Sequence, residues 1–232
     1  MLNGHRPTAN RQQPGARKRL GCLHMHHSNI AYIDGIIDPE RVEAVHFVEP
    51  GLMRRIASGA GFPQALAGAQ VERQLAWMAA CDLDAIVITC TNYIAMLPDD
   101  FDLGLPLIKI DEPFFTSMLR RPTPHLLLFT NPATVEGTMR RCAEFARAQG
   151  CEVDLDVDVI EGTFELVAAG RTNEYTALLA SRLQELIDEG RYASISVGQL
   201  SMATAAHEAT AATGFPIANP LDALRNHLAT TL

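Results

Sequence analysis

The chain has 232 residues, of which 47% are hydrophobic and 20% are charged, a balance typical of proteins that bury a core. Its 19 Lys and Arg residues against 27 Asp and Glu residues give a formal net charge of −8. A chain this acidic is a poor general binder of nucleic acid or of anionic membranes. It also contains no apolar run approaching the ~18 residues that a membrane-spanning helix needs, so we expect neither partner.

The N-terminal residues 1–18 contain several basic side chains, and no apolar stretch typical of an export signal follows them. We expect these residues to form a disordered tail. The chain has five cysteines, an odd number that does not suggest a disulfide framework. Free thiols in a chain of this size favour a reducing compartment, so we expect a cytoplasmic protein.

Short apolar runs alternate with helical patterns almost to the end of the chain. The runs that predict strands are residues 20–25, 42–48, 85–89, 107–110, 125–129, 153–157, 194–197 and 215–218. Apolar residues at helical spacing, bounded by proline and glycine, predict helices at 63–81, 132–150 and 172–189. This alternation predicts an α/β fold with parallel sheets covered on both faces. Such sheets bind ligands at the carboxyl ends of their strands, so functional residues are expected there.

Two strand ends resemble each other. Residues 84–90 form an apolar strand that ends at Cys90, and residues 193–199 form one that ends at Gln199, about half a chain later. The pattern predicts a duplicated unit: two similar Rossmann-like lobes with parallel sheets, related by a pseudo-twofold axis, with the active site in the cleft between them. We expect residues 19–113 plus 201–232 in the first lobe and 114–200 in the second.

Cys90 is the most informative single residue. It follows a buried strand and precedes a helix, where the positive end of the helix dipole favours a thiolate. Thr91 and Asn92 follow it with a hydroxyl, an amide and free backbone N–H groups that suit an oxyanion. A buried structural cysteine is the competing interpretation, and it fits Cys22 and Cys142. The surrounding Thr-Cys-Thr-Asn sequence favours a functional Cys90.

These strand ends give the chain its resemblance to a known family. An apolar strand ends in Ile86-Val-Ile-Thr-Cys-Thr-Asn92, and a later one ends in Asp111-Glu-Pro113. The second half opens with a strand and a Thr-rich turn, Leu126-Leu-Leu-Phe-Thr-Asn-Pro-Ala-Thr134. In this order the motifs resemble the aspartate/glutamate racemase superfamily, which includes aspartate, glutamate and hydantoin racemases, maleate isomerase and arylmalonate decarboxylase. The resemblance implies chemistry without an organic cofactor or metal, a small carboxylate substrate and a homo-oligomer.

One position departs from the family pattern. The racemases have a second cysteine at the equivalent strand end of the second lobe, where this chain has Gly198-Gln-Leu-Ser201. Gln199 can neither remove nor deliver a proton, and the Ser201 hydroxyl is a poor base without a partner. The pattern therefore indicates a single-cysteine subgroup in which two-thiol racemisation is in doubt.

The remaining candidates for the site are polar residues that follow strands. The set that we expect to bind substrate is Thr91, Asn92, Thr130, Asn131, Thr134, Gln199, Ser201, His26 and Ser28. Glu49, Asp111 and Glu112 also end strands, and each could orient a substrate or complement a helix dipole. A zinc site needs converging ligands, and no Cys or Asp at ligand spacing joins the histidines of residues 24–27, so we expect no metal. The chain also has no glycine-rich dinucleotide or phosphate motif.

Two functions of different classes remain open. The first is a cofactor-independent racemase-like or isomerase-like enzyme that acts on a small carboxylate or amino acid with Cys90 as its catalytic thiol. Racemisation with a substitute base, isomerisation and decarboxylation are all compatible with it, and the retained cysteine favours isomerase-type chemistry. The second is a non-catalytic protein of the same fold that binds small carboxylates and has lost the second catalytic cysteine.

Overall fold

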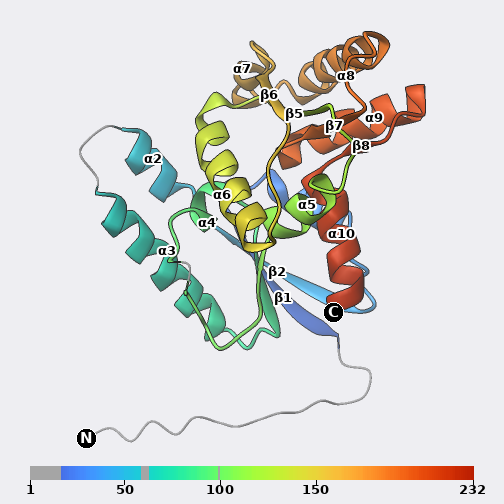
Figure 1. The fold of residues 1–232 in the computed structure, drawn as a ribbon. Coiled ribbons are helices and arrows are strands. Elements are labelled where there is room, and N and C mark those ends of the chain that lie inside the picture. The colour runs from blue at the N-terminus through green and yellow to red at the C-terminus, as the bar shows by residue number, and fades with distance from the viewer. Residues whose placement is uncertain (1–16, 59–62, 99) are drawn as a thin grey trace, which may run out of the picture.

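The computed structural model describes residues 17–58, 63–98 and 100–232, and within them the chain forms two parallel four-stranded sheets. In the first sheet the strand order is β2-β1-β3-β4, and in the second it is β6-β5-β7-β8. The two sheets therefore have the same strand order, in which the second strand of each half is an edge strand beside the first. The strands are β1 (Lys18–His24), β2 (Val42–Val48), β3 (Ala85–Ile88), β4 (Leu107–Lys109), β5 (His125–Phe129), β6 (Asp156–Val159), β7 (Ser194–Val197) and β8 (Ile217–Ala218). This is the predicted two-lobed α/β architecture (Figure 1).

Helices connect the strands and cover the sheets (Figure 1). In the first half they are α1 (Asn29–Asp34), α2 (Gly51–Ala57), α3 (Gln64–Ala79), α4 (Thr91–Ile94) and α5 (Asp111–Met118). In the second half they are η1 (Pro132–Thr134), α6 (Val135–Ala148), α7 (Thr163–Ala168), α8 (Thr172–Asp188), η2 (Leu200–Met202), α9 (Ala203–Thr213) and α10 (Pro220–Thr231). Among these described helices none is long and apolar enough to cross a membrane.

The central strands are buried on both faces, which explains their continuous apolar sequences. All four residues of β3 and all five of β5 are buried. Along β5, Leu126 and Leu128 contribute to a core shared with α8 and α9, whereas Leu127 and Phe129 contribute to a core shared with α5 and α6. Successive side chains point to opposite faces of a strand, so a strand covered on both sides must be apolar throughout.

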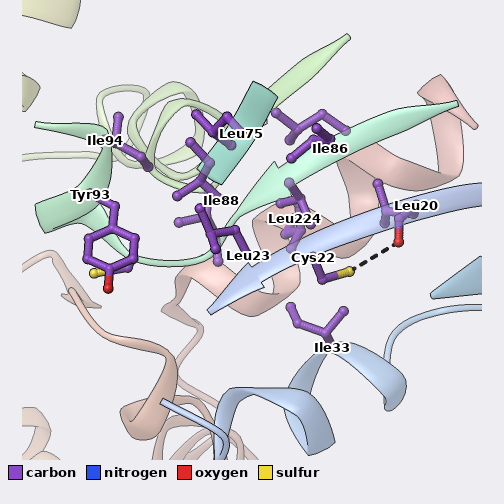
Figure 2. Close-up of a cluster of buried hydrophobic side chains, with 14 of the residues drawn as sticks. Leu20, Cys22, Leu23, Ile33, Leu75, Ile86, Ile88, Tyr93, Ile94 and Leu224 are labelled. Carbon is purple, nitrogen blue, oxygen red and sulfur yellow. Dashed lines mark hydrogen bonds between the residues drawn. The ribbon is translucent and has the colours of Figure 1, made fainter. Parts of the chain in front are cut away.

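The first lobe has its own core, drawn in Figure 2. Leu23 and Ile88 of the central strands lie among its buried side chains, together with Leu75 of α3. Cys22 lies on the other side of β1 from Leu23 and faces Ile33 of α1. Both faces of the first sheet are therefore covered, as they are in the second lobe.

The C-terminal segment differs from the expected division into lobes. β8 pairs with β7, and Ala205 and Ala209 of α9 lie in the core of the second sheet, so residues 205–218 belong to the second lobe rather than the first. Helix α10 returns to the first lobe: its Leu224 is buried in that lobe's core, and the helix lies against α5. The sequence predicts a strand at 215–218 but not the strand with which it pairs, because the pairing with β7 joins residues that are far apart in the chain.

Two other expectations concern the N-terminal residues and the edge strand β6. Residues 1–16 of the expected tail lie outside the described residues, while Lys18 is the first residue of β1 and pairs with Val42. β6 begins at Asp156, three residues later than expected. It is an edge strand whose exposed aspartates discourage pairing with another chain, so its sequence lacks the apolar run that marks the central strands.

Candidate active site at the strand ends

Cys90 occupies the position that the sequence predicts. β3 ends at Ile88, and Cys90 is the N-cap residue of α4 in an extended conformation, with φ −123° and ψ 111°. Its side chain is only 9% exposed, and its Sγ lies 3.9 Å from the sulfur of Met25. Thr91 and Asn92, the first residues of α4, are half-buried. Asn92 points toward α6 of the second lobe, because a Cβ on Gly137 would lie 3.6 Å from its Oδ1.

The expected thiolate is not what this environment favours. Burial raises the pKa of the Cys90 thiol to about 11, and the charge of Asp111 adds to the rise. Backbone N–H groups of Tyr93 and Asn92 act in the opposite direction. Helix α4 spans only one turn, so its dipole is small, and the cost of a buried negative charge outweighs it. Cys90 is therefore a protonated thiol at neutral pH.

Tyr93, one turn after Cys90, joins the site to the end of β2. Its hydroxyl donates to the backbone carbonyl of Glu49 and lies 3.1 Å from the Glu49 carboxylate. That carboxylate also accepts from the backbone N–H groups of Gly51 and Leu52, at 3.0 and 2.9 Å. Burial, followed by the charge of Glu49, raises the pKa of Tyr93. Glu49 thus caps α2 and fixes Tyr93, a residue that sequence reasoning missed because its partner is 44 positions away.

The other acidic candidates have structural partners. Asp111 begins α5 and is buried against Arg141 of α6, whose Nη2 lies 3.1 Å from its Oδ1. Glu112 lies 3.6 Å from both Lys109 and Arg141. These ion pairs join a helix that follows the first sheet to a helix of the second lobe. The carboxylates therefore hold the two lobes together at this point.

The histidines of the first strand end separate into two groups. His24 is completely buried and bonds to Thr89 through Nδ1, at 2.9 Å, and to His46 through Nε2, at 2.8 Å. Burial, followed by the charge of the neighbouring His46, lowers the pKa of His24 to about 4. His26 and Ser28 are exposed and bond to each other at 2.8 Å within the loop between β1 and α1.

Gln199 occupies the position in the second lobe that Cys90 occupies in the first. It comes two residues after β7 and is the N-cap residue of η2, again in an extended conformation, with φ −133° and ψ 146°. Its Oε1 accepts three hydrogen bonds: from the Thr130 N–H at 2.7 Å, the Thr130 hydroxyl at 2.9 Å and the Asn131 N–H at 3.1 Å. These three donors form an oxyanion-type cradle at the end of β5, and the Gln199 carbonyl fills it.

The second lobe's site continues through Tyr175 of α8. Its hydroxyl lies 3.2 Å from the Thr130 hydroxyl and 3.1 Å from that of Ser201. Burial raises the pKa of Tyr175, although these two hydrogen bonds act to lower it. In the sequence Tyr175 is an apolar-face residue of a predicted helix, and only the fold reveals its hydroxyl at the strand ends. Asn131 and Thr134 use their side chains within their own turn, since Asn131 Oδ1 accepts from Ala133 and Thr134 donates to the Asn131 carbonyl.

The candidate residues of the two lobes adjoin across the boundary between the sheets. Helix α4 contacts α6, and η2 contacts α1. Cys90 and Thr130 are both buried. Two surface hollows lie elsewhere, one between the end of β6 and α8 and one around residues 170–174.

Comparison with known proteins identifies the fold. No protein-family model matches the sequence, and no curated protein matches it either. Among solved structures, Picrophilus torridus aspartate racemase has a TM-score of 0.67 at 14% identity, covering 92% of this chain and 94% of its own. Allantoin racemase from Klebsiella pneumoniae has a TM-score of 0.60 at 17% identity, covering 92% and 86%. Glutamate racemase from Aquifex pyrophilus has a TM-score of 0.52 at 14% identity, covering 92% and 84%. The chain therefore has the two-lobed fold of the aspartate/glutamate racemase superfamily, as its strand-end residues predict.

Proposed function

We propose that this protein is a cofactor-independent enzyme of the racemase and isomerase type, which acts on a small carboxylate or amino acid through a single catalytic thiol, Cys90. The observation that carries the proposal is the equivalence of Cys90 and Gln199. Both are extended N-cap residues two positions after the third strand of their sheet, yet only one of them has a side chain that can transfer a proton.

The chemistry that suits Cys90 starts from its protonated state. A thiol with a pKa of about 11 can deliver its proton to a carbanion or enolate next to a carboxylate, and its thiolate is then a strong base. The N–H groups of Asn92 and Tyr93 would stabilise that thiolate in the transition state. Proton transfer on one face of the substrate fits an isomerisation, or a proton exchange that retains configuration.

The second lobe supplies hydrogen-bond donors. Because the Gln199 carbonyl is fixed by Thr130 and Asn131, its amide N–H groups have a fixed direction as well. We infer that they donate to a substrate oxygen at the place where a two-thiol racemase has its second thiol. Asn92, from α4, and Ser201, from η2, add further donors of the type that a carboxylate requires.

The direct test is exchange of substrate hydrogen for deuterium, followed by NMR over small carboxylates and amino acids. Cys90→Ser should keep the fold, since the change is nearly isosteric, and should abolish exchange, since a serine hydroxyl has a far higher pKa. Cys142→Ser is the matched control, because Cys142 is also buried but lies on α6. Equal exchange by the wild type and Cys90→Ser would contradict the proposal.

A second function is favoured by one observation, the Gln199 carbonyl that fills the cradle of donors from Thr130 and Asn131. A thiol that stays protonated, opposite a filled oxyanion cradle, also suits a protein that binds small carboxylates without converting them. In that case a bound carboxylate would raise the melting temperature of the protein. Neither the wild type nor any variant would exchange the hydrogens of that carboxylate for deuterium. Binding without exchange across the panel would select this function over the enzyme.

A further inference from the structure

A second cluster of reactive side chains lies at the edge of the first sheet, between β1, β2 and α1. Cys22 and His24 are two residues apart on β1, and His46 pairs with Cys22 in the parallel register of β2. The alternation of side chains along a strand therefore places all three on one face of the sheet. Their ligand atoms, one from each residue, lie within 4.8 Å of one another. Figure 2 shows Cys22 on the side of β1 that faces Ile33 of α1.

The hydrogen bonds of His24 and His46 require more protons than two neutral imidazoles carry. The Thr89 hydroxyl donates to the Leu23 carbonyl at 3.1 Å, so Nδ1 of His24 must donate its proton to Thr89. The Asp34 carboxylate lies 2.9 Å from Nε2 of His46 and requires a proton there. Each neutral imidazole carries only one N–H. The two remaining nitrogens, His24 Nε2 and His46 Nδ1, then face each other as lone pairs at 2.8 Å.

A positive charge between these nitrogens resolves the arrangement. We propose that the charge is a metal ion of the zinc class, held by the two nitrogens and by the sulfur of Cys22. Imidazole nitrogen and thiolate sulfur are the donors that such borderline-soft ions prefer. On binding, the Cys22 thiol releases its proton to solvent, and no electron is transferred. The thiolate and the Asp34 carboxylate together balance the two charges of a divalent ion.

The surrounding residues fit the environment of a metal site. A ligating histidine usually donates its outer N–H to a carboxylate or another oxygen, which fixes the ring and strengthens the ligand. Here Asp34 is the partner of His46, and Thr89 is the partner of His24. Tetrahedral coordination at Zn–N distances of 2.0–2.1 Å would require the two nitrogens to separate by about half an ångström. A fourth ligand, such as water, would complete the tetrahedron.

An ion could reach the cluster from the surface beside His46. The His46 side chain is 17% exposed and the Asp34 side chain 56% exposed, whereas Cys22 and His24 are completely buried. Sequence reasoning missed this cluster because it looked for a cysteine beside the histidines of the loop. The parallel pairing of β1 with β2 instead brings Cys22 opposite His46, 24 residues later.

The experiment uses the reduced full-length protein, stripped with a chelator, and Co²⁺ as a coloured probe for the zinc site. We expect one equivalent to bind, with the intense visible bands of tetrahedral Co²⁺ and a near-ultraviolet thiolate-to-cobalt band that Zn²⁺ abolishes. Cys22→Ser should remove the thiolate band, and His46→Gln should weaken binding. Asp34→Asn should lower affinity by about 10- to 100-fold, the usual effect of an outer partner.

Two further variants separate this site from the other thiols and from the proposed catalytic function. Cys90→Ser and Cys142→Ser should both keep the cobalt–thiolate band, because neither thiol is part of the cluster. Circular dichroism confirms that each variant is folded, and if Cys22→Ser does not fold, His46→Gln carries the test. A wild-type protein without the band, or a band that survives both variants, would overturn the proposal and leave a shared proton as the positive charge.

Discussion

The side-chain carbonyl of Gln199 accepts a hydrogen bond from the backbone N–H of Thr130 across 2.7 Å, and two further donors complete its environment. Gln199 is therefore fixed by hydrogen bonds at the strand end of the second lobe, and its role there is more than the absence of a cysteine. Its carbonyl oxygen lies where two backbone amides and a hydroxyl converge, an arrangement that also suits an anion.

Removing the Gln199 side chain should expose unsatisfied donors. We expect Gln199→Ala to lower the free energy of unfolding by about 1–3 kcal/mol, the usual cost of leaving buried polar groups without partners. Gln199→Glu should be tolerated near neutral pH, because a carboxylate accepts the same hydrogen bonds. Those donors lower the folded-state pKa of the new carboxyl, so its stabilisation is lost as the pH falls through that value. Urea unfolding of both variants at neutral and acidic pH would measure this. Equal stability of Gln199→Ala and wild type would contradict it.

A thiol at the same position should change the chemistry. In Gln199→Cys, the amides of Thr130 and Asn131 lose their carbonyl acceptor and would stabilise a thiolate instead. If the site retains racemase geometry, this second thiol should create or raise α-hydrogen exchange with inversion of configuration. Gln199→Ser is the matched control without a proton-transferring thiol. If the native reaction is instead an isomerisation that needs one thiol, Gln199→Cys should leave the rate of that reaction unchanged or lower it.

Alkylation should reveal the elevated pKa of Cys90. With a pKa of about 11 and 9% exposure, Cys90 should react slowly with iodoacetamide at neutral pH and faster as the pH rises toward that value. The exposed Cys151 is an internal reference in the same digest. Mass spectrometry of the peptides over a pH series gives both rates. Faster modification of Cys90 than of Cys151 at neutral pH would show that the thiol is activated and that the burial argument is wrong.

His125 should make stability depend on pH. It is 3% exposed, bonds to Ser196 at 2.8 Å, and burial followed by the charge of Arg121 lowers its pKa from 6.5 to about 4. Between those values the unfolded chain binds a proton that the folded protein does not, so stability falls as the pH falls. Between about pH 7.5 and about pH 5, His125 alone should lower the free energy of unfolding by roughly 2 kcal/mol.

The comparison that isolates this share is wild type against His125→Gln, whose amide can still bond to Ser196. We expect His125→Gln to lose less free energy of unfolding over that pH interval, measured by urea denaturation at each pH. Parallel curves for the two proteins would mean that His125 is protonated equally in both states.

The elements that could be predicted from sequence are those whose signal is local. β2, β5 and β7 have the predicted bounds, because buried runs such as His125–Phe129 end sharply at turn residues. Cys90 and Gln199 could be placed because the carboxyl end of a strand follows from its sequence. β6 could not, since an edge strand with exposed aspartates has no apolar run.

The parts that could not be predicted depend on long-range contacts. Tyr175 reaches Thr130 across 45 positions, and Tyr93 reaches Glu49 across 44. His46 meets Cys22 only because β1 and β2 pair in one register, and a shift by one residue would place it on the other face. Side chains of this kind carry no periodic signal, because their partners are fixed by the sheet and not by their neighbours in the chain.

Helix α10 limits how the protein can open. It begins directly after β8 of the second sheet, yet its Leu221, Leu224 and Leu228 lie in the core of the first lobe. Sliding the lobes apart would pull these leucines into water, at roughly 1.5–3 kcal/mol for each side chain. The C-terminal helix therefore couples the second sheet to the core of the first lobe, and the two lobes cannot separate without an energetic cost.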